Sequence, residues 1–80
     1  MRIPRDVDGD KLTGLLSRYD YETTRQTGSH IRLTTQRNGE HHLTVPRYRP
    51  LNVGTLNAII TDVANHLGLS KEQVIRELFS

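Results

Sequence analysis

Two short apolar patterns on either side of a glycine-containing loop constrain the fold of this chain most. Ile31 and Leu33 alternate with polar residues, as do Leu43 and Val45. A period of two is typical of strands that bury one face. Pairing Leu33 with Leu43 brings all four apolar side chains to one face and leaves a three-residue loop over residues 37–39, whereas a two-residue turn would mix the faces. The sequence therefore predicts an antiparallel hairpin with the three-residue loop.

A second tight turn precedes this hairpin. Residues 21–26 are rich in Thr, Tyr and Arg, a composition that favours a strand. A two-residue turn at Thr27-Gly28 would follow, because glycine adopts positive φ without steric cost. This turn would set Arg25 opposite His30, with their Cβ atoms about 5 Å apart. Since Ile31 faces the core, alternation places His30 and Arg32 together on the outer face.

Helical patterns flank the strands. Apolar residues at helical spacing predict a helix that ends near Tyr19 and is capped by Asp6 or Asp8, and a second that starts at Asn52 or at Gly54-Thr55 and ends at Gly68. A capping box at residues 70–73 begins a short last helix. The order is helix, three antiparallel strands, helix and short helix. We therefore predict a single α+β domain over residues 1–80, with its helices on one face of a three-stranded antiparallel sheet and the other face open.

Composition narrows the class of protein. The chain of 80 residues has no cysteine, which excludes disulfides and thiolate zinc sites. It has no apolar run of membrane-spanning length, so we expect a cytoplasmic protein that does not contact membranes. Nine of its 11 basic residues are Arg, and the stretch from Arg25 to Arg49 holds five Arg against one acid, Glu40. Such a basic middle segment favours an anionic partner.

The histidines are not arranged for metal binding. In the predicted register His42 pairs with Thr34, about 13 Å along the strand from His30. His41 points to the opposite face, and we expect this neighbouring pair to be polar strand residues. We predict no metal site and no cofactor, because no third ligand is evident.

A histidine flanked by arginines suits RNA cleavage. Imidazole can take the proton of a ribose 2′-OH and imidazolium can protonate the leaving oxygen, while arginines stabilise the charge on the phosphate. We expect His30 to be catalytic, and the residues predicted to bind RNA are Ser29 beside it, Arg25 and Arg32 at the scissile phosphate, and Arg47 and Arg49 on the flanking strand. Tyr48, between the last two, could stack on a base. The alternatives are a non-catalytic RNA-binding module and a protein-interaction domain.

The chain also resembles a known family. The segments 3–7, 25–33, 43–47, 54–60 and 68–70 are similar, in order, to the HicA (YcfA-like) toxin ribonucleases. The resemblance implies a fold like the double-stranded-RNA-binding domain and metal-independent cleavage of mRNA by an mRNA interferase of a toxin–antitoxin system. It also implies inhibition by a HicB-type antitoxin, and it assigns the catalytic role to His30. We do not expect direct DNA binding.

Two departures from the family pattern stand out. Tyr48 replaces a histidine that many members carry after the Pro-Arg pair, and residues 62–66 lengthen the second helix by about one turn. The basic middle segment predicts that an antitoxin presents an acidic surface. Tyr48 and Phe79 are candidates for its apolar contacts.

Overall fold

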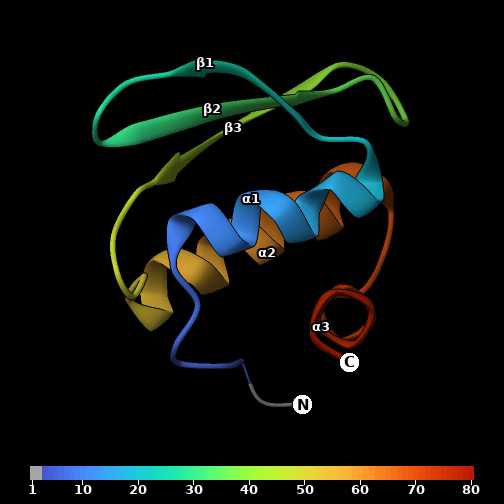
Figure 1. Ribbon diagram of the computed structural model, residues 1–80. Coiled ribbons are helices and arrows are strands. Elements are labelled where there is room, and N and C mark those ends of the chain that lie inside the picture. Colours follow the sequence, from blue (N-terminus) through green and yellow to red (C-terminus); the bar gives the residue numbers. More distant parts are fainter. Residues whose placement is uncertain (1–2) are drawn as a thin grey trace.

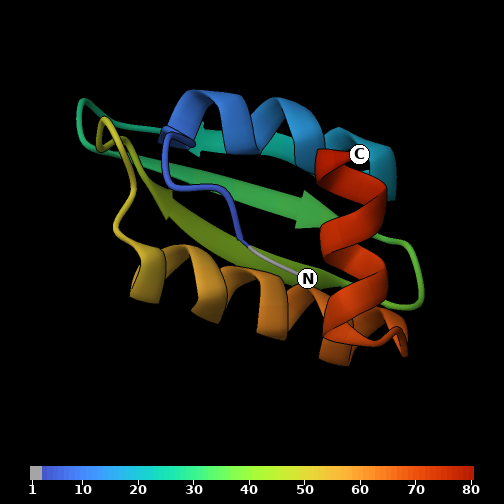
Figure 2. The ribbon, with the colours of Figure 1, turned by 90° about the horizontal axis from the view of Figure 1, so that it is seen from below.

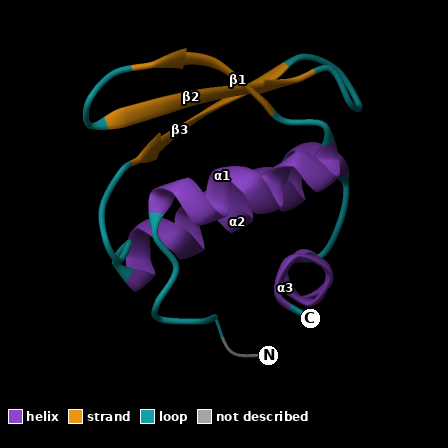
Figure 3. Cartoon of the chain, viewed as in Figure 1, coloured by secondary structure: helices purple, strands orange, loops and turns teal. Residues whose placement is uncertain are grey.

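The fold consists of one antiparallel sheet with all helices on one of its sides (Figures 1 and 3). The structure is a computed structural model that describes residues 3–80. Its elements are α1 (Gly9–Leu16), a 3-10 turn (Ser17–Tyr19), β1 (Glu22–Gln26), β2 (His30–Thr35), β3 (His41–Pro46), α2 (Val53–Leu67) and α3 (Lys71–Phe79). The sheet order is β1-β2-β3. The predicted α+β architecture and its element order are confirmed.

The predicted register of the β2–β3 hairpin is also confirmed. Leu33 pairs with Leu43 and Ile31 with Val45, and these four side chains are buried. In the loop, the amide of Gly39 donates to the carbonyl of Gln36 over 3.2 Å. Asn38 and Gly39 both take positive φ, at 60° and 100°, the conformation that favours these residue types. The loop therefore has the turn chemistry on which the register prediction rested.

The predicted β1–β2 turn is wrong. Arg25 pairs with Arg32, not with His30, because the tight turn lies one residue further on, at Gly28-Ser29. β1 also shifts register between Thr23 and Arg25. Gly28 is not among the glycines of residues 3–80 that take positive φ, so glycine is not required there for backbone geometry. β1 is an edge strand with every residue exposed. No apolar alternation was present to fix its register.

Three side chains begin the helices. Asp8, Asn52 and Ser70 each accept a hydrogen bond from the backbone amide three residues ahead. Gly68 ends α2 in the left-handed conformation, as predicted. The helices and the inner face of the sheet enclose one aliphatic core with two buried tyrosines at its edge, Tyr19 and Tyr21. No helix within residues 3–80 combines the length and hydropathy needed to cross a membrane.

The N-terminal segment is tied to the connection that follows β3. The amide of Gly9 donates to the carbonyl of Tyr48 over 3.2 Å, and the amide of Leu51 donates to the carbonyl of Val7 over 2.8 Å. A Cβ at position 9 would lie only 2.2 Å from the carbonyl oxygen of Pro46. One end of the molecule therefore holds the β1–β2 corner, the β3–α2 connection and the start of α1 (Figure 2).

Candidate functional site

His30 is the first residue of β2 and stands exposed at the β1–β2 corner. The corner is held by Thr27, whose amide donates to the carbonyl of His30 over 2.9 Å and whose Oγ1 accepts from the amide of His30 over 3.1 Å. The hydroxyl of Ser29 lies 3.1 Å from Nδ1 of the His30 ring. Among residues 3–80, no side chain or carbonyl bonds the other ring nitrogen, Nε2. The backbone is therefore fixed, while Nε2 of the imidazole remains available for proton transfer.

Two arginines lie on the same side of the sheet as His30. Arg32 is two residues along β2, so both side chains share the outer face, and Arg25 is the cross-strand partner of Arg32. Within the described part of the chain, neither guanidinium forms an ion pair or a side-chain hydrogen bond. The corrected register thus still places two uncommitted cations next to the histidine. An anion bound there would be stabilised by both.

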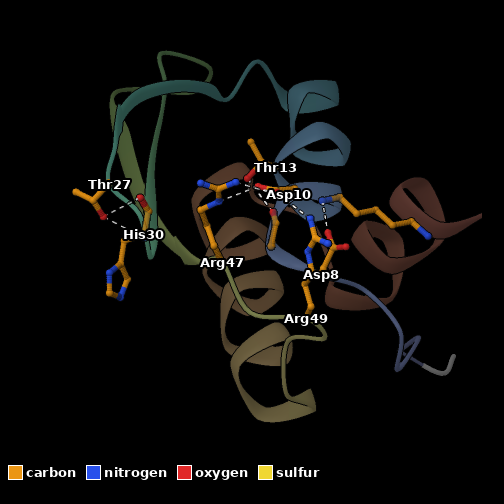
Figure 4. A network of polar contacts seen from close by, with 9 residues as sticks. Asp8, Asp10, Thr13, Thr27, His30, Arg47 and Arg49 are labelled. Atoms are coloured by element: carbon orange, nitrogen blue, oxygen red, sulfur yellow. Dashed lines mark hydrogen bonds and ion pairs between the residues drawn. The ribbon is translucent and has the colours of Figure 1, made fainter.

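The other two predicted arginines have an acidic partner. The Arg47 amide donates to the carbonyl of Ser29 over 2.9 Å, which joins the β3–α2 connection to the corner. The Arg47 guanidinium forms two bonds with the Asp10 carboxylate, of 3.2 and 3.3 Å, and Arg49 lies 3.8 Å from the same carboxylate. Figure 4 shows both arginines turned toward Asp10 on α1 and the His30 ring pointing away from them. The structure therefore brings the backbone of Arg47 to the corner, but the charged groups of both arginines lie at Asp10.

His42 has a separate environment. It pairs with Thr34, as predicted, and its ring bonds Thr34 Oγ1 and Glu40 Oε2, each over 2.8 Å. The hydrogen bond from His42 holds the pKa of Glu40 below its usual value. His42 is thus engaged by its neighbours at the far end of the strand from His30, which makes it a poor partner for catalysis at the corner.

His41 points to the opposite face from His42, as predicted, but it is more than a polar strand residue. It is half-buried on the helix side of the sheet, where its ring bonds the Tyr21 hydroxyl over 2.8 Å and Asp62 over 3.2 Å. It also stacks on His66, with ring centroids 4.3 Å apart. Burial and the nearby Asp62 raise the pKa of Tyr21 to about 12. These contacts make His41 a structural residue. Two of its partners, Asp62 and His66, lie on α2, and strand periodicity cannot reveal contacts with a helix.

The additional turn of α2 therefore has a packing role. His66 Nε2 lies 2.8 Å from the carbonyl of Arg37 and 3.0 Å from that of Gly39, and Asn38 donates to the carbonyl of His66 over 2.8 Å. These bonds dock the β2–β3 loop onto the end of α2. The sequence contains His66 and Asn38 as polar residues able to form these bonds, but only the fold brings the two together.

The corner is a projecting surface. Two clefts among residues 3–80, of about 420 and 430 Å³, are both lined by Arg37, near the β2–β3 loop. His30 lines neither of them. Residues 3–80 contain no cluster of three or more His, Cys, Asp or Glu side chains that could hold a metal ion.

Comparison with known proteins identifies the family. The family described as the HicA toxin of bacterial toxin–antitoxin systems matches residues 9–65, from the start of α1 to near the end of α2. Searches of curated proteins and of solved structures find no match. The matched region holds the corner, both arginine pairs and Asp10, and it spans well over half of the 80 residues. The chain therefore belongs to the HicA toxin family of bacterial toxin–antitoxin systems.

Proposed function

We propose that this toxin is an endoribonuclease that cleaves mRNA at the β1–β2 corner, with His30 as its catalytic residue. The observation that carries the proposal is the state of the imidazole. Ser29 lies at Nδ1, and Nε2 is open beside two unpaired arginines. His41, which has a structural role, has both of its ring nitrogens engaged instead.

The reaction we assign is transesterification within the RNA. His30 Nε2 takes the proton of a ribose 2′-OH, and that oxygen attacks the adjacent phosphorus. The bond from phosphorus to O5′ breaks, leaving a 2′,3′-cyclic phosphate on one fragment. The imidazolium returns its proton to O5′, which becomes the 5′-hydroxyl of the other fragment. One histidine suffices for both transfers, because each occurs at the same phosphate and the side chain starts and finishes neutral.

The arginines divide into two groups in this proposal. Arg25 and Arg32 bind the phosphate that reacts, where guanidinium groups stabilise the charge that develops on its oxygens. Arg47 and Arg49 bind phosphates of the flanking RNA in competition with Asp10. Ser29 keeps the imidazole in a single orientation.

The test is incubation of purified protein with single-stranded RNA in EDTA. We expect cleavage, with cyclic phosphate and 5′-hydroxyl ends on the products. Salt-sensitive binding without cleavage would replace this proposal with a non-catalytic RNA-binding module. Neither binding nor cleavage would favour a protein-interaction domain.

Membership of the family implies an antitoxin partner, and we propose that it is a HicB-type protein that covers the corner. Its surface there should be acidic, because the face carries unpaired Arg25 and Arg32. Hydrogen exchange of the complex should show protection of residues 27–32. Protection of α2 and α3 alone would refute masking of the corner.

A further inference from the structure

One tyrosine differs from the other two in exposure. Tyr48 is 55% exposed, whereas Tyr19 and Tyr21 are 4% and 2% exposed. The single phenylalanine, Phe79, is half-buried against the core, and the chain has no tryptophan. Tyr48 is therefore the one aromatic side chain of residues 3–80 that offers a large open surface.

The backbone that carries this ring is fixed from three directions. The carbonyl of Tyr48 accepts from Gly9 on α1, and the amide of the preceding residue, Arg47, donates to Ser29. The Arg47 side chain is held by Asp10. An aromatic group on a braced backbone loses little conformational entropy when it binds.

The position of the ring relates it to the candidate active site. His30 pairs with Pro46, two residues before Tyr48. Two Cα–Cα steps of at most about 3.8 Å each and a cross-strand spacing of about 5 Å keep the Cα atoms of His30 and Tyr48 within about 13 Å of each other. Arginines stand on both sides of the tyrosine in the chain. A single strand of RNA can offer a base to the ring, and phosphates to these two arginines in competition with Asp10.

We propose that Tyr48 is a stacking platform for an unpaired base of the RNA, next to the nucleotide at which His30 acts. This inference rests on the proposed ribonuclease function and adds to it the class of substrate: RNA that is single-stranded at this point, because a base paired in a duplex cannot place its face on the ring. Stacking makes no hydrogen bonds to base edges, so any preference among bases follows stacking strength.

The experiment measures binding of a 2′-O-methyl single-stranded oligonucleotide, which has no 2′-OH and cannot be cleaved. A matched oligomer that is abasic throughout has the same phosphates and no rings. Tyr48→Leu should weaken binding of the first oligomer by roughly 5- to 100-fold. Tyr48→Phe, which keeps the ring, should stay within about twofold of the wild type. The abasic oligomer should bind all three proteins alike.

Tyrosine fluorescence gives a second readout. Because tryptophan is absent and the other tyrosines are buried, a base that stacks on Tyr48 should quench the exposed part of the emission. The Tyr48→Phe variant should bind the base-containing oligomer without this quenching. The abasic oligomer should leave the emission of the wild type unchanged.

The inference fails if Tyr48→Leu binds both oligomers as the wild type does, or if it loses affinity for both equally. It also fails if the variant keeps oligomer binding but loses the antitoxin, which would make the ring a protein contact. RNA cleavage in EDTA, measured on the same proteins, distinguishes a failure of the stacking proposal from a failure of the ribonuclease proposal. Cleavage by the wild type with no effect at Tyr48 refutes only the stacking platform, and absence of both cleavage and oligomer binding refutes the ribonuclease as well.

Discussion

The close contact at Gly9 predicts that replacing this glycine lowers the free energy of unfolding, and it indicates by how much. A Cβ at this position would lie 2.2 Å from the Pro46 carbonyl oxygen and 3.0 Å from the Arg47 Cα, both backbone atoms that cannot rotate away. Relieving this overlap should cost about 1–3 kcal/mol. It would also stretch the hydrogen bond from Gly9 to Tyr48, with a loss of about 1 kcal/mol. The higher helix propensity of alanine returns at most about 1 kcal/mol, so Gly9→Ala should lower the free energy of unfolding by about 2 kcal/mol.

Gly14 provides the matched control within the same helix. No heavy atom outside its own helix lies within 4 Å of a Cβ built there. Gly14→Ala should therefore raise the free energy of unfolding by about 0.5–1 kcal/mol, from helix propensity and unfolded-state entropy. Urea denaturation measures both variants, and in a domain of this size 1 kcal/mol corresponds to about 4–8 °C in Tm. Equal stability of the two variants would refute the close approach of α1 to the β3–α2 connection.

The remaining predictions concern charges and histidines. Asp10→Asn should release two arginines and tighten RNA binding, with a steeper salt dependence; an unchanged slope in a salt titration would contradict competition between Asp10 and phosphate. His66→Ala should lower stability by about 1–3 kcal/mol and speed amide exchange in the β2–β3 loop, and unaltered exchange would contradict the docking of that loop. His42→Ala should return the pKa of Glu40 toward 4.5, as followed by carboxyl NMR. The folded pKa of Glu40 lies below its unfolded value, so the hydrogen bond from His42 stabilises the fold above about pH 4.5, and this stabilisation is lost as the pH falls through the folded pKa. A His42→Ala protein with the same acid titration as the wild type would contradict a stabilising role for this bond.

Apolar periodicity was sufficient to predict β2, β3 and their pairing. Ile31, Leu33 and Leu43 must share a buried face, and the short loop with Asn38 and Gly39 selects one of the registers that allow this. β1 offered no such constraint because all of its residues are exposed, and its register shift and the position of its turn were missed. The starts of α1 and α3 could be predicted from the sequence, because Asp8 and Ser70 are residue types that cap a helix by accepting a bond from a nearby backbone amide.

Contacts between distant segments could not be read from the sequence. The tight approach of Gly9 to Pro46 and Arg47 joins segments far apart in the chain and has no local sequence signal. The role of His41 depends on Asp62 and His66, which come from a helix that periodicity cannot position against β3. The pairing of Asp10 with Arg47 likewise joins segments far apart in the chain. At the corner itself, alternation correctly placed His30 and Arg32 on the outer face, because that inference needed only the burial of Ile31.

The central claim is that His30 performs the chemistry, and one comparison tests it most directly. Cleavage of single-stranded RNA in EDTA is measured for the wild type, His30→Ala and His42→Ala, with unfolding by urea as a check that each is folded. His30 is exposed, so its replacement should leave the fold intact. We expect cleavage to cyclic-phosphate ends by the wild type and by His42→Ala, and none by folded His30→Ala. Cleavage by His30→Ala at a rate near that of the wild type would contradict it.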